Sequence, residues 1–169
     1  MSAFSSVPTA QGLYDPNFEH DACGVAFVAT LTGVPSHEIV VQALTALRNL
    51  DHRGASGSEV DTGDGAGILV QVPDEFLRAV VEFELPAKGE YAVGTGFLPD
   101  NVAEADAAAK TIEAIAAQEG VTVLGWRDVP ITEGLVGATA ASVMPTFRQL
   151  FLSATNPDGS AARGQELER

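Results

Sequence analysis

Short apolar runs, each bounded by glycine, proline or polar residues, constrain the fold of this 169-residue chain more than any other feature. Runs of five to eight residues that contain β-branched and aromatic side chains are typical of buried strands. We expect strands at residues 23–29, 68–72, 91–98, 121–126, 136–143 and 146–153. No run approaches the ~18 apolar residues that a membrane-spanning helix needs, so we expect no membrane span.

Three segments between these runs show the three- and four-residue apolar spacing of amphipathic helices. The expected helices cover residues 36–50, 74–84 and 102–118. Asn101 is placed to cap the last of them, and Gly120 to end it in a left-handed conformation. Because several expected strands follow one another directly, the sequence favours a layered α+β fold over a doubly wound parallel sheet.

The charge balance excludes one class of partner. The chain has 9 Lys+Arg against 23 Asp+Glu, a formal net charge of -14. Such a chain would be repelled by the phosphates of nucleic acid, so we expect no nucleic-acid binding. An apolar fraction of 46% is too high for wholesale disorder.

The single cysteine, Cys23, excludes an intrachain disulfide framework and a cysteine-cluster metal site. It fits a reducing compartment, and we expect a cytoplasmic protein. The acidic residues near His20 are typical of a solvated segment, so we expect no metal site there. Residues 1–22 contain no Lys or Arg and no long apolar stretch, which disfavours a secretory signal.

Cys23 stands where this polar leader meets an apolar run. A lone cysteine is more often a small buried apolar residue than a nucleophile. If the bond between Ala22 and Cys23 were cut, however, the cysteine would carry a free α-amino group with a pKa of ~7.7–8.0. One residue would then supply both nucleophile and base. Its thiolate could attack a carboxamide to give an acyl-enzyme and release ammonia.

Two polar loops are further candidates for a functional site. In the first, Arg53 could present its planar fork to a carboxylate or a backbone group, or the loop could simply be solvated. The adjacent His52 is assigned a structural role, since an N-terminal nucleophile needs no second base. The second loop, residues 63–67, precedes an expected strand, which is the wrong context for phosphate binding. Its glycines favour a tight turn or close backbone packing.

Four motifs occur together in one order along the chain. They are Leu13-Tyr14-Asp15-Pro16 with Glu19-His20-Asp21-Ala22-Cys23-Gly24-Val25; Leu50-Asp51-His52-Arg53-Gly54-Ala55; Thr62-Gly63-Asp64-Gly65-Ala66-Gly67-Ile68; and Leu124-Gly125-Trp126-Arg127-Asp128-Val129-Pro130. In this ordered set the chain resembles the start of the large subunit of bacterial glutamate synthases. That region is a class II glutamine amidotransferase domain.

The resemblance implies the N-terminal-nucleophile fold, an αββα sandwich of two antiparallel sheets with helices outside. It implies that residues 1–22 are a propeptide whose removal exposes Cys23, and that residues 23–169 are the N-terminal part of the amidotransferase domain. Arg53 matches an arginine beside the nucleophile, where it would bind substrate or orient the cysteine.

The implied reaction is hydrolysis of L-glutamine, with the ammonia feeding the reductive amination of 2-oxoglutarate. The resemblance also implies cofactors in the intact enzyme: FMN, an iron–sulfur cluster, and NADPH or NADH acting through a small subunit. We expect none of these cofactors on this segment.

The family's oxyanion-hole Asn-Gly pair, and the arginine and aspartate that hold the glutamine carboxylate, lie further along than this chain reaches. We therefore expect an incomplete sandwich with little glutaminase activity on its own. Two alternatives stay open: another N-terminal-nucleophile amidohydrolase, and a non-catalytic α/β binding module.

Overall fold

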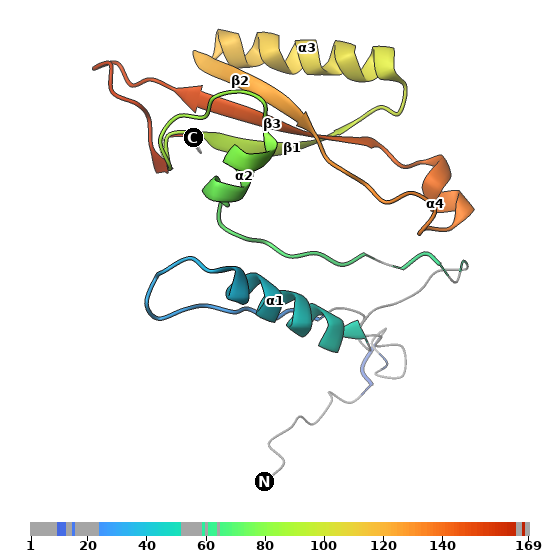
Figure 1. The fold of residues 1–169 in the computed structure, drawn as a ribbon. Coiled ribbons are helices and arrows are strands. Elements are labelled where there is room, and N and C mark those ends of the chain that lie inside the picture. Colours follow the sequence, from blue (N-terminus) through green and yellow to red (C-terminus); the bar gives the residue numbers. More distant parts are fainter. Residues whose placement is uncertain are drawn as a thin grey trace. The chain divides into compact units, whose positions relative to one another are not determined.

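The computed structural model describes residues 10–12, 15, 24–51, 59, 61–63, 65–164 and 167. The chain divides into two compact units, residues 1–68 and residues 69–169 (Figure 1). No described helix has both the length and the apolar character that crossing a membrane requires.

The second unit is built on a three-stranded antiparallel sheet. Its strands are β1 (Ala92–Leu98), β2 (Val121–Asp128) and β3 (Thr146–Ala154), in the spatial order β1-β3-β2. These three strands confirm the predictions at 91–98, 121–126 and 146–153. An antiparallel sheet accompanied by helices also agrees with the expected α+β class.

The register sorts the side chains of the central strand β3 onto two faces. Gln149 lies opposite Thr95 of β1 and Arg127 of β2, so these three side chains share one face. The next row on that face contains Phe151. A register shift between Val123 and Gly125 marks a β-bulge in β2, which leaves Leu124 without a partner in the ladder.

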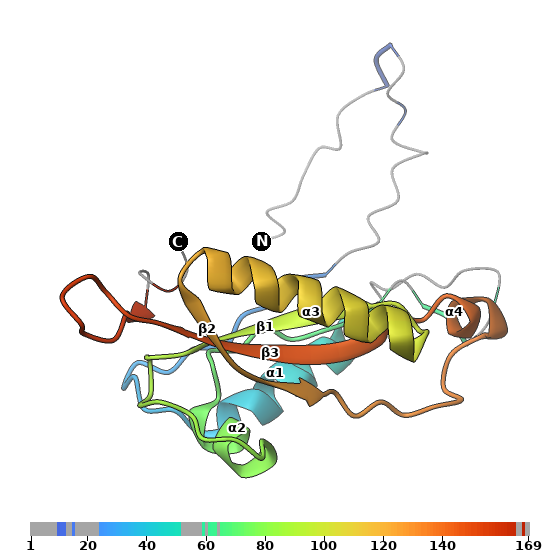
Figure 2. The same ribbon diagram turned by 90° about the horizontal axis from the view of Figure 1, so that it is seen from above.

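Helix α3 (Val102–Gln118) covers one face of this sheet, as Figures 1 and 2 show. Its capping was predicted correctly: the Asn101 side chain accepts bonds from the backbone N–H groups of Ala103 and Glu104. Gly120 then has φ 74°, the left-handed conformation that ends a helix. Ala105 is buried, because a small side chain lets the helix approach the strands closely.

The opposite face carries the main apolar core, packed beneath helix α2 (Asp74–Val80). Leu77, Tyr91 and Phe151 form its buried centre, and Phe83 meets Phe151 edge-to-face at 5.2 Å between ring centroids. The predicted helix 74–84 is too long. Val81 has an extended backbone conformation. From there, every second side chain packs on the core, at residues 81, 83 and 85, and this spacing of two is that of an extended chain.

A second correction concerns residues 136–143, predicted as a strand. They contain helix α4 (Ala138–Ser142) instead. Three of its five residues are alanine, the residue with the highest helix propensity, and this outweighs the apolar character that suggested a strand.

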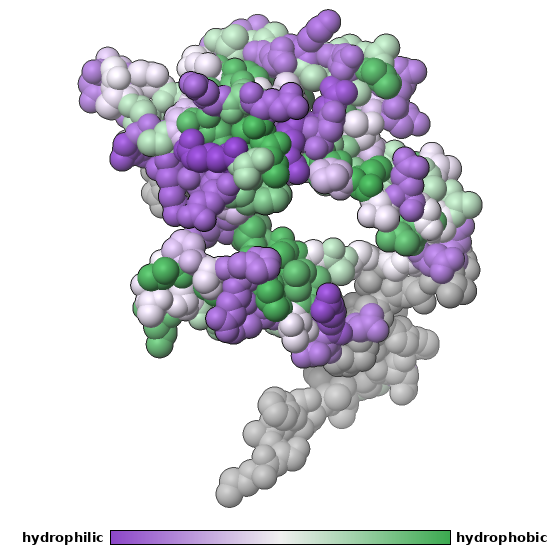
Figure 3. Space-filling view, in the orientation of Figure 1, coloured by the Kyte–Doolittle hydropathy of each residue, from purple (hydrophilic) through white to green (hydrophobic). Residues whose placement is uncertain are grey.

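In the first unit, helix α1 (His37–Asn49) confirms the helix expected over 36–50. Two predicted strands are wrong. Residues 24–29 of this unit and residues 68–72, which cross the unit boundary, have no strand structure. Val25 and Phe27 are 93% and 92% exposed rather than buried. An apolar run becomes a strand only when another segment pairs with its backbone, and no described residues pair with these runs. Apolar side chains therefore contribute to the visible surface in Figure 3.

Candidate functional site

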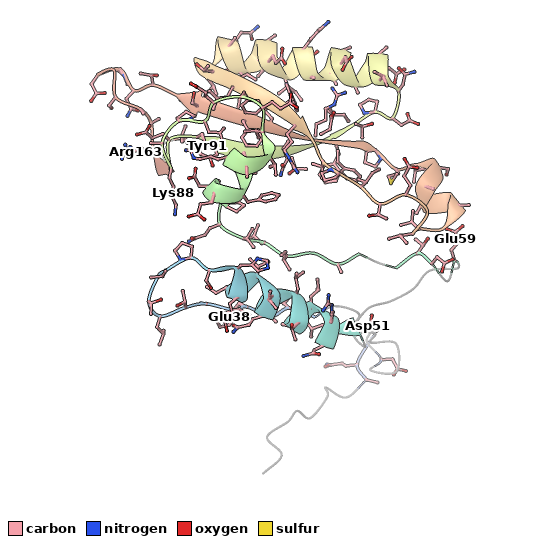
Figure 4. The ribbon with its side chains drawn as sticks, viewed as in Figure 1. Glu38, Asp51, Glu59, Lys88, Tyr91 and Arg163 are labelled. Atoms are coloured by element: carbon pink, nitrogen blue, oxygen red, sulfur yellow. The ribbon has the colours of Figure 1, made fainter. Side chains whose placement is uncertain are left out.

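The predicted site residues Cys23 and Arg53 lie outside the described residues, as does His52, and the structure describes their neighbours in the chain. Gly24, which follows Cys23, is exposed. Helix α1 ends at Asn49, and the Leu50 N–H bonds the carbonyls of Ala46 and Leu47, each at 3.1 Å. Asp51, labelled in Figure 4, therefore follows directly on a closed helix end, and it belongs to the motif that contains Arg53.

The glycine-rich segment before residue 68 is partly described. The Thr62 hydroxyl donates to Glu59 Oε2 at 3.1 Å, and its N–H donates to the Glu59 carbonyl at 3.2 Å. Gly65 has φ 98°, which a residue with a Cβ rarely adopts. These contacts agree with the predicted tight turn; Asp64 lies outside the described residues.

In the second unit, an ionic cluster joins α2 to the start of β1. The Tyr91 hydroxyl donates to Asp74 Oδ1 at 2.9 Å, and Arg78 Nε donates to Asp74 Oδ2 at 3.1 Å. Arg78 also bonds the carbonyls of Leu85 and Pro86. Figure 4 labels Tyr91 near Lys88 at this end of the sheet. The cluster fixes the segment between α2 and β1 against the helix.

These contacts shift the pKa values of Tyr91, Asp74 and Arg78. Burial, reinforced by the bond to Asp74, raises the pKa of Tyr91 to about 12. The hydrogen bond from Arg78 is the main cause that lowers the pKa of Asp74. All three groups keep their ordinary protonation state at neutral pH, so this cluster stabilises the fold and offers no acid or base for catalysis.

A second ionic cluster joins α3 to the sheet. Arg148 Nη1 lies 2.9 Å from Asp106 Oδ1 on α3, and Arg148 Nε lies 3.0 Å from Asp128 Oδ1 on β2. The buried Nε makes this close ionic contact without the angles of a hydrogen bond. The bond to Asp106 is the main cause that raises the pKa of Arg148.

Arg127 is in a different environment on the other face. Its Nη1 donates to Gln149 Oε1 at 2.8 Å, and its guanidinium lies 5.7 Å from the centre of the Phe76 ring. The sequence analysis named Arg127 only as a member of the motif over residues 124–130 and gave it no role. Its partner Gln149 is 22 positions away, so only the strand register shows that the two side chains meet.

An open groove of about 670 Å³ lies between the C-terminal half of α3 and the edge of β2. Glu113 is the one carboxylate among the residues that line this groove. Its Oε1 accepts a hydrogen bond from the Trp126 indole N–H at 2.8 Å, so this carboxylate already has a partner. The groove contains no nucleophilic thiol. Across the described ranges, no group of three or more His, Cys, Asp or Glu side chains is placed to hold a metal ion.

Comparison with known families defines the class. Residues 23–169 match the family of class-II glutamine amidotransferases. This match covers most of the chain, so the chain belongs to that family.

The relatives compared with the chain are glutamate synthases. The chain is 47% identical over 154 residues to the glutamate synthase [NADPH] large chain of Bacillus subtilis, covering 90% of this chain and 10% of that protein. It is 42% identical to the glutamate synthase [NADH] of Saccharomyces cerevisiae, with 86% and 7% covered. It is 38% identical to ferredoxin-dependent glutamate synthase 2 of Synechocystis, with 89% and 10% covered. The chain thus spans about a tenth or less of the length of these relatives.

Proposed function

We propose that this chain is the glutamine-hydrolysing portion of a glutamate synthase and that Cys23 is its nucleophile. One observation carries the proposal: the match to class-II glutamine amidotransferases covers residues 23–169, and Cys23, at its first position, is the only thiol in the sequence. The substrate would be L-glutamine, the amide donor that the name of the family states.

The proposed reaction begins after the bond between Ala22 and Cys23 is cut, which makes residues 1–22 a propeptide. The free α-amino group of Cys23 accepts the thiol proton, since its pKa of ~7.7–8.0 leaves much of it unprotonated at neutral pH. The sulfur attacks the side-chain amide carbon of glutamine, and a new C–S bond forms. The C–N bond then breaks, the nitrogen takes the proton, and ammonia leaves.

Water completes the cycle. It attacks the thioester carbon, the C–S bond breaks, and glutamate leaves while the sulfur recovers its proton. Arg53 would bind the substrate or orient the cysteine. Its guanidinium is permanently charged and planar, which suits a carboxylate or a backbone carbonyl.

We further propose that the three-stranded sheet is one layer of the αββα sandwich. Two facts support this architecture. Helix α3 covers only one face of the sheet, as an outer helical layer would. The apolar runs at 24–29 and 68–72 have strand composition and exposed side chains, such as Leu69 at 101% exposure, that a second sheet would use.

The wider reaction is a proposal drawn from the relatives. Ammonia from Cys23 would feed the reductive amination of 2-oxoglutarate by the remaining domains and a small subunit, in the cytoplasm. In the intact family FMN and an iron–sulfur cluster support that step and NADPH or NADH supplies its electrons. A cluster of that kind needs about four thiolate ligands, and one cysteine does not fit it, so we place the cluster elsewhere in the protein.

A panel of amides tests the substrate and the nucleophile together. In the natural-length protein, glutamine should be hydrolysed, and Cys23→Ala should abolish this while ammonia-dependent glutamate formation persists. Hydrolysis of a different amide in preference to glutamine would contradict the substrate. Full activity of Cys23→Ala would contradict the nucleophile.

The isolated 169 residues should hydrolyse glutamine poorly, because the sequence contains no Asn-Gly dipeptide to supply the expected oxyanion-hole pair. Loss of one oxyanion donor costs about 10²–10³ in rate. Rapid hydrolysis by this chain, lost in Cys23→Ala, would contradict that expectation.

A further inference from the structure

A tight hairpin turn follows strand β3, and it contains the dipeptide Asp158-Gly159. The Asn156 N–H donates to the Ser160 carbonyl at 2.8 Å, and the Gly159 N–H donates to the Asn156 carbonyl at 2.9 Å. Gly159 has φ 85°, and these features fit a type I turn closed by a glycine bulge. Asp158 and Gly159 are both exposed. The dipeptide is therefore held in one backbone conformation while it stays open to water.

An aspartate followed by glycine can react with its own backbone. When the carboxyl group is in its acid form, the glycine nitrogen attacks the side-chain carboxyl carbon, because glycine has no Cβ to hinder the approach. A C–N bond forms, the amide proton and the carboxyl OH leave as water, and a five-membered succinimide results. A second water then opens this ring. When it breaks the bond between the nitrogen and the original backbone carbonyl, the chain continues through the side chain as isoaspartate.

Two contacts of the folded turn oppose this reaction. The Gly159 nitrogen is held in its protonated form, since it donates that proton to the Asn156 carbonyl. Asp158 Oδ1 accepts bonds from the Ser160 hydroxyl at 2.6 Å and from the Ser160 N–H at 2.9 Å. The hydroxyl bond is the main cause that lowers the pKa of Asp158, so less of the reactive acid form is present at a given pH. The Asn156 side-chain amide donates to the same hydroxyl at 3.1 Å, which holds Ser160 in place.

We propose that Asp158 is a site of isoaspartate formation that the folded turn keeps inactive and that local opening of the turn activates. The sequence supplies the reactive pair. The Ser160 hydroxyl disfavours the acid form of the carboxyl group, and the Asn156 carbonyl disfavours loss of the amide proton. Exposed turns open more often than the core does, because few buried contacts oppose the motion. This modification site is separate from Cys23 and from the hydrolysis of glutamine.

Isoaspartate at this position would disturb the segment that follows the turn. It adds one carbon to the backbone, so the isolated bridge between Thr155 and Ala161 would lose its register. Beyond the bridge, Ala162 is only 3% exposed, and Arg163 forms an ion pair with Glu90 just before β1. The modification would therefore loosen the attachment of this segment to the sheet unit.

Ageing of the natural-length protein at neutral pH tests the proposal. Trypsin cuts after Arg148 and Arg163, and chromatography with electron-transfer fragmentation then measures isoaspartate in the peptide 149–163. We expect Ser160→Ala to form isoaspartate about 2- to 10-fold faster than the wild type, the change that one net hydrogen bond corresponds to. Ser160→Thr keeps a hydroxyl group, so this matched control should age as slowly as the wild type. A synthetic peptide of residues 149–163, which has no fold to hold the turn, should react fastest.

Three results would overturn the proposal. They are a wild-type protein that reacts as fast as the synthetic peptide, a Ser160→Ala variant no faster than the wild type, and a Ser160→Thr variant as fast as Ser160→Ala. Circular dichroism checks that each variant is folded. If Ser160→Ala does not fold, the comparison of the wild type with the peptide decides. The readout does not involve Cys23, so it stands apart from failure of the proposed glutaminase chemistry.

Discussion

Adding one methyl group at Gly125 should destabilise the sheet unit through Phe83. A Cβ built on Gly125 would lie 2.6 Å from two carbons of the Phe83 ring and 2.9 Å from a third, closer than real Cβ atoms come. The ring cannot retreat freely, because it packs edge-to-face on Phe151, which is 0% exposed. Overpacking of this kind costs about 1–3 kcal/mol. We expect Gly125→Ala to lower the free energy of unfolding by about 2 kcal/mol, roughly a 30-fold change in the unfolding constant.

Urea denaturation, followed by tryptophan fluorescence of Trp126, measures this change in the 169-residue chain. Gly94→Ala is the matched control, because a Cβ at Gly94 in strand β1 meets nothing within 4 Å. That variant should be neutral or more stable by up to about 1 kcal/mol, since alanine restricts the unfolded chain. The difference between the two variants isolates the contact with Phe83 from the backbone effect.

A double-mutant cycle with Phe83→Leu refines the prediction. Leucine removes the ring that the new methyl group meets, so Gly125→Ala should cost little when it is added to Phe83→Leu. The reasoning would be refuted if Gly125→Ala alone changed stability by less than about 0.5 kcal/mol. It would also fail if the two substitutions proved additive.

Three further outcomes follow from the described contacts. Phe151→Ala should cost about 3–5 kcal/mol in urea denaturation, because it empties the centre of the core. The raised pKa of Tyr91 means that its contribution to stability is complete below pH about 10 and is lost as the pH rises toward 12. Thermal melts from pH about 7 to about 11 should therefore show that the difference in melting temperature between the wild-type chain and Tyr91→Phe shrinks above pH about 10. A difference that stayed constant with pH would contradict the raised pKa of Tyr91. Asn101→Ala should cost about 0.5–2 kcal/mol and should reduce amide-exchange protection at Ala103 and Glu104, whose N–H groups lose their acceptor.

Local signals in the sequence predicted α1, α3 and the three strands of the sheet well. Asn101 and Gly120 mark the ends of α3 because each satisfies backbone groups without help from distant residues. The limits of β1 and β3 follow from proline and glycine at their flanks. Helix α4 was missed because an alanine-rich segment with flanking valines has strand and helix signals of similar strength.

The wrong strand predictions at 23–29 and 68–72 share a physical cause, since each depends on a partner distant in sequence. Residues 24–29 have the composition of a strand, but strand structure requires a paired backbone. The contact between Arg127 and Gln149 was invisible for the same reason, because the register of β2 against β3 creates it. For the candidate site, the sequence motifs predicted Cys23 and Arg53; both lie outside the described residues, and their roles stay predictions.

The central claim is that Cys23 becomes an N-terminal nucleophile that attacks glutamine. The most direct measurement treats the active, natural-length protein with the glutamine-like electrophile diazo-oxo-norleucine and analyses its N-terminal peptide by mass spectrometry. The account predicts one covalent adduct on the sulfur of Cys23, with Cys23 as the first residue of the mature chain and glutamine protecting it. An active enzyme that still begins at Met1 or Ser2, or an adduct on a different residue, would contradict it.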